Sequence, residues 1–244
     1  MVHIIGFLYK CIHWCRIGIH CRFFFYSTIW CSMPKMLILT GPRGAGNHLW
    51  SKVFSLHPAV YGWKTLLDNY WEAHRFAEPF CNHWRDNSLL AEFDWSQSDY
   101  YFTSISLPLG IHGSDANPIW MPDIAGFVAA VEQCGVDVQV AVCGRDQSIL
   151  EHQQTRIRHN RTFPLFMDEL PKIRNPLFLS YELLYLYKGQ YLNSLDVNIP
   201  VAWNSPAIHE ILKLDSNAKY IHYLDDYLLD NCNATGITLT ELSK

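Results

Sequence analysis

The feature that most limits how this chain can fold is a short apolar run that ends in a glycine-rich turn. The run Leu37–Thr40 reads Leu-Ile-Leu-Thr, which is typical of a buried parallel strand. The turn Gly41–Gly46 contains three glycines, too many for a regular helix or strand. From Asn47 to Leu56 apolar residues recur at helical spacing, and His57-Pro58 ends the pattern. This order of strand, glycine turn and helix predicts one unit of a layered α/β fold.

The same alternation of strand and helix continues through the body of the chain. Strand patterns occupy 100–105, 138–143 and 177–180, and helical patterns occupy 122–133, 147–158 and 181–193. Strands that alternate with helices predict a parallel central sheet with helices on both faces, which is a three-layer α/β fold. The stretch 64–93 is irregular but mostly helical in pattern, and 205–230 predicts helix packed on the outside.

The first 32 residues differ in character from the rest. They carry Lys10, Arg16 and Arg22 and no acidic residue, so their formal charge is +3 in a chain whose net charge is −4. These cations interrupt the run of about 20 apolar residues that a membrane span needs. We therefore expect 1–32 to lie outside the core fold and 33–244 to form a single domain. A membrane anchor and a Cys/His metal knuckle within 1–32 are the alternatives.

Net charge and cysteine usage exclude some function classes. A net charge of −4 does not provide the general basic footprint of a nucleic-acid-binding protein. Four of the eight cysteines fall within 1–32, the others are scattered singly, and no Cys-x-x-Cys pair occurs. Scattered cysteines are typical of small core residues in a reducing compartment. We expect a soluble intracellular protein without a metal ion and without a nucleic-acid partner.

The glycine turn has the outline of a phosphate-binding loop, but not its full chemistry. Backbone N–H groups of such a loop and the helix N-terminus behind it can surround an anion. A nucleotide triphosphatase requires lysine and then serine or threonine after the last glycine, and this chain has Asn47 and His48 there. Arg43 can offer a forked cation to an oxyanion. We therefore expect a fold of the P-loop type, and a glycine turn without a ligand is the alternative.

A second candidate anchor follows the strand at 138–143. Arg145 comes directly after Gly144, at the carboxyl end of that strand and before the helical pattern that begins at Gln147. Open α/β sheets bind their ligands at the carboxyl ends of parallel strands. Arg145 is therefore predicted to face a ligand, and a surface arginine is the alternative.

Three segments of the chain resemble, in their order, the motifs of the P-loop sulfotransferase family. They are Pro42–Trp50, the strand that leads to Arg145 and the Tyr181-Glu182 junction. The resemblance covers roughly residues 36–200. The resemblance implies that the chain binds 3′-phosphoadenosine 5′-phosphosulfate (PAPS) without a metal ion. Residues implied to surround the phosphosulfate are Arg43, Gly44, Ala45, Gly46, Asn47 and His48. Arg145 and Gln153 are implied to hold the 3′-phosphate, although Gln153 replaces the family's serine and the loop has one extra residue.

The family's catalytic histidine has no direct counterpart in this chain. Ser106 takes its place at the end of the middle strand, and a serine is a poor base unless another group activates it. The candidate catalytic residues are therefore His48, Ser106 and His112, with Asp68 and Glu72 as further substitutes. For His48, His112, Asp68 and Glu72, an ordinary surface or core position is the alternative. Three aromatic residues are candidates for stacking on adenine, with core packing as the simpler interpretation: Trp50, Trp63 and Tyr101.

Together these patterns predict a sulfotransferase-like enzyme that moves a sulfuryl group from PAPS to a hydroxyl or an amine. The acceptor is expected to be a small molecule or a glycan. Two alternatives stay open. One is a P-loop nucleotide-binding or kinase-like protein that lacks the Walker lysine, and the other is a non-catalytic binding module on the same fold.

Overall fold

The computed structural model describes residues 33–69, 72–110, 119–156 and 161–213. The predictions for 1–32, for His112 and for the part of the C-terminal helix beyond 213 lie outside these ranges.

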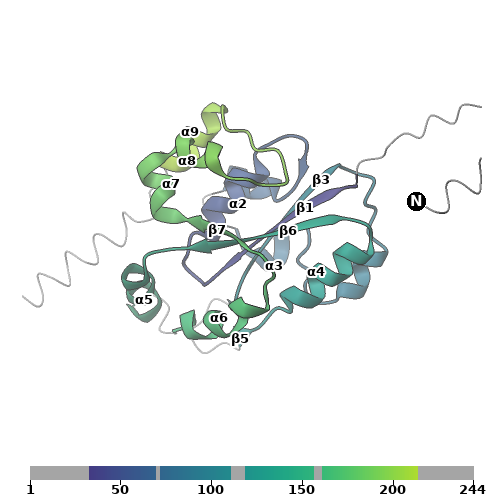
Figure 1. Cartoon of the computed structure of the whole chain (residues 1–244), viewed down its shortest axis with the longest axis horizontal. Coiled ribbons are helices and arrows are strands. Elements are labelled where there is room, and N and C mark those ends of the chain that lie inside the picture. Colours follow the sequence, from purple (N-terminus) through teal and green to yellow (C-terminus); the bar gives the residue numbers. More distant parts are fainter. Residues whose placement is uncertain (1–32, 70–71, 111–118, 157–160, 214–244) are drawn as a thin grey trace, which may run out of the picture. The chain divides into compact units, whose positions relative to one another are not determined.

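A parallel sheet of five strands lies at the centre of the described fold (Figure 1). Its spatial order is β2-β3-β1-β6-β7, and every neighbouring pair is parallel. The strands are β2 (Val60–Tyr61), β3 (Tyr100–Ser106), β1 (Lys35–Gly41), β6 (Asp137–Gly144) and β7 (Leu177–Ser180). The predicted parallel sheet is therefore confirmed, and the predicted glycine turn follows its central strand.

Helices cover both faces of this sheet (Figure 1). One face packs against α2 (Asn47–Ser55), α7 (Tyr181–Tyr187), α8 (Gly189–Ser194) and α9 (Pro206–Lys213). The other packs against α4 (Ile124–Gln133) and α6 (Phe163–Glu169). Successive residues of β1 alternate between the two cores, since Leu37 and Leu39 join the first while Met36 and Ile38 join the second. This alternation is what a strand buried on both faces requires.

All but one of the remaining elements are five residues long or shorter. They are the 3-10 helices η2 (Lys64–Asp68), η3 (Asn87–Ala91) and η4 (Leu170–Lys172), the helices α3 (His74–Ala77) and α5 (Gln147–Arg156), and the antiparallel pair β4 (Leu109–Gly110) and β5 (Ile119–Trp120).

The structure differs from the sequence prediction in two places. The stretch 64–93 contains only short helical pieces, because aromatic side chains such as Phe80 and Trp84 anchor its turns in the core. The predicted helix 181–193 is two helices, since Lys188 adopts a φ of 45° between α7 and α8. Helical spacing alone did not reveal either feature.

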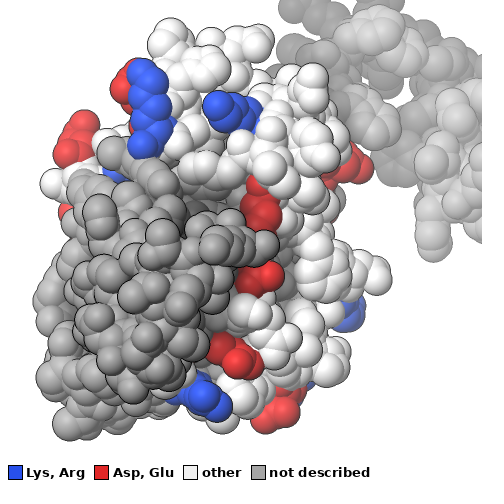
Figure 2. Space-filling view, turned by 90° about the vertical axis from the view of Figure 1, so that its left-hand side faces the viewer, with Lys and Arg blue, Asp and Glu red and all other residues white. Residues whose placement is uncertain are grey.

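Charged side chains are interspersed on the face that Figure 2 shows. Acidic and basic groups form separate spots among uncharged residues, and neither sign makes a continuous patch among the coloured atoms of this view. On the coloured part of this face, anion binding would therefore depend on individual groups.

The strand register brings the candidate residues together. Gly41 at the end of β1 pairs with Ser106 of β3, and Thr40 pairs with Val142 of β6. The glycine turn, Ser106 and Arg145 consequently share the carboxyl edge of the sheet. In an open parallel sheet this edge is the ligand-binding edge.

Candidate functional site

The glycine turn closes on itself and then opens into α2. Ala45 N donates to Pro42 O at 3.1 Å, which makes a tight turn. Gly44 and Gly46 have φ values of 94° and 99°, in the left-handed region that glycine enters without strain. Gly46 caps α2 and offers no side-chain acceptor to the first N–H groups of this helix. The turn therefore presents the positive end of a nine-residue helix.

Arg145 lies directly against this turn. Its Nη1 donates to Gly44 O at 3.0 Å and to Gln153 Oε1 at 2.9 Å. Its guanidinium lies over the ring of Tyr181, 4.8 Å from the ring centre. The turn and the arginine, which are 101 residues apart in the chain, thus form one cluster with Gln153. The structure brings together these sequence-predicted residues.

Gln154 fixes the other side of the turn. Its Nε2 donates to Arg43 O at 2.8 Å, and its Oε1 accepts from the N–H groups of Thr162 and Phe163 at 3.0 Å each. The side chain is fully buried. Sequence reasoning missed this residue, because a glutamine inside a polar helical segment gives no signal of burial.

We expect Gln154→Ala to destabilise the fold by about 2 kcal/mol, because one buried and two partly buried backbone groups lose their partner. Urea unfolding measures the change. Gln147→Ala is the matched control, since Gln147 is exposed on the same helix α5, and it is expected to change stability by less than about 0.5 kcal/mol. Equal effects of the two substitutions would contradict this role for Gln154.

The side chain of Asn47 is hydrogen-bonded to residues at the ends of β1, β3 and β6. Its Nδ2 donates to Ser106 Oγ at 2.6 Å and to Gly41 O at 3.4 Å, and its Oδ1 accepts from the thiol of Cys143. Burial raises the pKa of that thiol, which keeps it a neutral donor. A donating carboxamide does not remove a proton from Ser106, so this contact does not activate the serine as a base.

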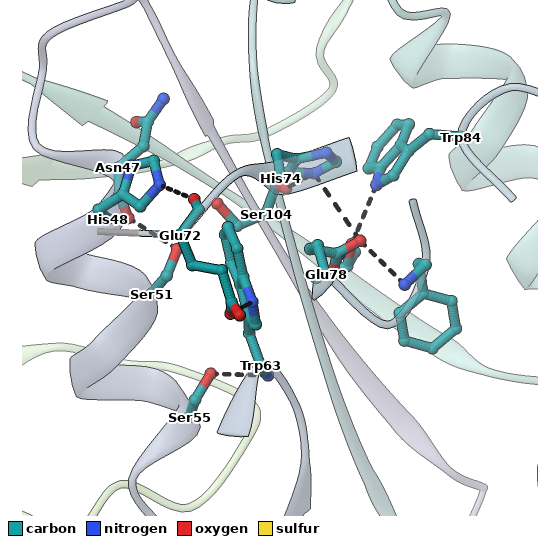
Figure 3. Close-up of polar contacts among 12 residues, drawn as sticks. Asn47, His48, Ser51, Ser55, Trp63, Glu72, His74, Glu78, Trp84 and Ser104 are labelled. Carbon is teal, nitrogen blue, oxygen red and sulfur yellow. Dashed lines mark hydrogen bonds and ion pairs between the residues drawn. The ribbon is translucent and has the colours of Figure 1, made fainter. Parts of the chain in front are cut away.

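His48 contacts the segment that precedes α3 (Figure 3). Its Nε2 lies 3.0 Å from Glu72 O, and a carbonyl only accepts, so Nε2 carries the hydrogen. The carboxylate of Glu72 accepts from Trp63 Nε1 at 2.8 Å and from Thr65 Oγ1 at 2.6 Å. The structure therefore brings together two of the predicted base candidates, with the backbone of one fixing the ring of the other.

The other predicted residues lie elsewhere. The guanidinium of Arg43 lies beside the backbone of Gly110, where a Cβ would come within 2.8 Å of it. Asp68 is exposed at the end of η2. The three aromatic candidates for adenine stacking are buried core residues: Trp50, Trp63 and Tyr101. Core packing is thus their role.

A buried carboxyl group that the sequence did not reveal lies near this edge. Glu78 Oε1 accepts from Thr103 Oγ1 at 2.7 Å, and Oε2 accepts from Phe80 N at 2.8 Å. Trp84 Nε1 donates to the same threonine at 2.9 Å. Burial raises the pKa of Glu78 to about 8, although these hydrogen bonds act in the opposite direction. Glu78 is therefore protonated at neutral pH.

His74 completes this buried cluster (Figure 3). Its Nε2 is hydrogen-bonded to Ser104 O and lies 3.7 Å from Glu78 Oε2. Burial lowers the pKa of His74 to about 4, against the effect of the Ser104 carbonyl. The pair is consequently a neutral imidazole beside a neutral carboxyl at pH 7.

The sequence has no match among known protein families, curated proteins or solved structures. Within the described residues, no three histidine, cysteine, aspartate or glutamate side chains are grouped so that they could hold a metal ion. None of the helices in the described ranges is both long and apolar enough to cross a membrane.

Proposed function

We propose that this chain is a P-loop-type, PAPS-dependent sulfotransferase that uses the glycine turn and Arg145 as one nucleotide site. The observation that carries the proposal is the contact between Arg145 and Gly44 O at the carboxyl edge of the parallel sheet. Two groups that suit phosphate lie there within one cluster, on the loop after β1 and at the end of β6. A ligand at this edge agrees with the general rule for open α/β sheets.

The residues present suit the two charged ends of PAPS. The uncapped N-terminus of α2 offers backbone N–H groups and a positive helix end to the phosphosulfate. Arg145 and Gln153 would hold the 3′-phosphate, since a guanidinium has five N–H donors and binds phosphate through two of them at once. Glycine at position 46 keeps this cradle open, because a Cβ there would meet Tyr181.

PAPS supplies an activated sulfuryl group. In the transfer, the acceptor oxygen or nitrogen forms a bond to sulfur while the bond from sulfur to the phosphate oxygen breaks. His48 takes the proton that the acceptor loses. The contact of Nε2 with Glu72 O leaves Nδ1 as the basic atom of the neutral ring. The N–H groups of α2 stabilise the charge that develops on the departing phosphate.

The acceptor in this proposal is a small molecule or a glycan that carries a hydroxyl or an amine, and the protein acts in the cytoplasm. The proposal needs no metal ion, because the helix N-terminus and the arginine provide the positive charge.

The proposal is tested by the thermal shift that adenosine 3′,5′-bisphosphate (PAP) causes. At about 100 times its Kd, PAP is expected to stabilise the protein by about 2.7 kcal/mol, a Tm increase of roughly 5–10 °C. In Arg145→Ala the affinity is expected to fall about 10- to 100-fold, because one charge-assisted contact is lost. The control is Arg174→Ala, which removes an exposed arginine paired with Glu132, and it should keep the full shift.

Other outcomes of the thermal-shift experiment would favour other functions. Stabilisation by magnesium ATP but not by PAP would favour a kinase-like protein, and a response to neither nucleotide would leave a binding module. A PAP shift that persists in Arg145→Ala would contradict the site as proposed.

A further inference from the structure

We propose that residues 72–80 form a proton-controlled strap, which holds His48 in position while Glu78 is protonated and loosens when Glu78 ionises. Glu78 is a positioning residue in this proposal. The inference rests on the proposed function only in giving His48 a catalytic role. The strap itself depends only on contacts among the described residues.

The strap crosses the end of β3 and is attached at three points (Figure 3). At its start, Glu72 O accepts from His48 and the Glu72 carboxylate accepts from Trp63. In its middle, His74 is hydrogen-bonded to the carbonyl of Ser104. At its end, the side chain of Glu78 reaches the core. The strap thus connects the base candidate to the strand that carries Ser106.

The three attachments differ in depth. Glu72 binds Thr65, whose side chain is exposed, and water can compete for that bond. Glu78 is 1% exposed, and its carboxyl is bonded on both oxygens. His74, in the middle, has 10% of its side chain exposed, so Glu78 is the deepest of the three attachments, and its bonds depend on the protonation of its carboxyl.

Nothing described around Glu78 compensates a negative charge there. The nearest ionisable group is His74, which is neutral because burial lowers its pKa to about 4. Burial raises the pKa of the Cys81 thiol, and an ionised Glu78 would raise it further, so this thiol offers no positive charge. On β3 the carboxyl meets the hydroxyl of Thr103. Arg85 acts on His74 and Cys81, but is not among the groups that shift Glu78.

A buried carboxylate without a cation is unstable, so ionisation favours a state in which Glu78 reaches water. A hollow of about 600 Å³ borders the strap and gives it room to move. Ala77 and Pro79 of the strap line one part of this hollow, and Lys64 and Thr65 line another. An outward movement of the strap carries Glu72 away from His48 and removes the contact that fixes the ring.

Hydrogen exchange of the full chain at pH 6.5 and pH 9.0 tests the strap, with each rate divided by the intrinsic rate at that pH. Protection of residues 72–80 is expected to fall about 30-fold in the wild type, because opening becomes about tenfold easier for each pH unit between pH 6.5 and the raised pKa of Glu78 and then levels off. Glu78→Gln should lose less than about twofold, because glutamine stays neutral. The matched control is Glu92→Gln, an exposed carboxylate that should behave as the wild type.

A second measurement follows His48 itself. Imidazole nitrogen resonances of the wild type should show that Nε2 carries a hydrogen at pH 6.5 and only partly does so at pH 9.0, whereas in Glu78→Gln Nε2 should keep its hydrogen at both pH values. Equal pH responses in the two proteins, or full protection of the wild-type strap at pH 9.0, would overturn the proposal. PAP binding at pH 6.5 is measured separately, so a failure of the nucleotide site is distinguishable from a failure of the strap.

Discussion

Glu78→Gln is expected to raise the free energy of unfolding at pH 7 by about 2–3 kcal/mol, which corresponds to an increase in Tm of roughly 5–10 °C. The native carboxyl has a pKa of about 8, and the unfolded chain has the ordinary value near 4.5. At pH 7 the unfolded state therefore gains stability from an ionised glutamate that the folded state lacks. Glutamine removes this gain. Its Oε1 can accept from Phe80 N, and its Nε2 can donate to Thr103 Oγ1 once the threonine hydroxyl, which donates to Glu78 in the wild type, turns away.

The direction of this change follows from how Glu78 makes the stability of the fold depend on pH. Between about pH 4.5 and 8 the folded state binds the extra proton of Glu78, so this residue lowers stability as pH rises, and the loss is complete above pH 8. His74 acts the other way. Its folded pKa of about 4 lies below the ordinary 6.5, so it lowers stability as pH falls through this interval. The two effects oppose each other between about pH 4.5 and 6.5.

Chemical denaturation at a series of pH values measures the difference between Glu78→Gln and the wild type. That difference should grow from near zero at pH 4.5 to a constant value above pH 8. Glu92→Gln again serves as the control and should show no such slope. A difference that does not vary with pH would mean that Glu78 is ionised in the folded protein.

Much of the layered fold follows from local patterns. The strand patterns at 37–40, 100–105 and 138–143 correspond to β1, β3 and β6, which lie side by side at the centre of the sheet. Strands buried on both faces read as continuous apolar runs, and this signal is strong. The edge strand β2 has only two residues, too few for any periodicity to appear.

The candidate site was predictable to the extent that it lies next to these strands. The glycine turn and Arg145 follow β1 and β6 directly, and the topology of a parallel sheet brings the two loops to one edge. Glu78, His74 and Gln154 gave no such signal. Each is a polar residue that becomes buried through contacts distant in sequence, such as those of Glu78 with Thr103. Burial of this kind depends on tertiary packing and not on spacing along the chain.

Gly46→Ala is expected to destabilise the protein by about 2–5 kcal/mol and to abolish the thermal shift with PAP. Two effects contribute. A φ of 99° is unfavourable for a residue with a side chain, at a cost of about 1–2 kcal/mol. An added Cβ would also lie 2.5 Å from Cδ2 of Tyr181, which is a buried ring with little freedom to move, and such overpacking costs about 1–3 kcal/mol.

Two other glycines separate these effects in the same unfolding experiment. Gly135 has a φ of 78°, but nothing lies within 4 Å of the place that a Cβ would take, so Gly135→Ala reports the backbone cost alone, about 1–2 kcal/mol. Gly189 begins α8 without a positive φ and without a close neighbour, so Gly189→Ala should be neutral or stabilising by up to about 1 kcal/mol. If Gly46→Ala cost no more than Gly135→Ala, the turn would not be packed tightly against Tyr181. The N-terminus of α2 would then not be held at a fixed distance from Arg145. A ligand such as PAP, whose two phosphates would bind these two groups, requires that distance to be fixed.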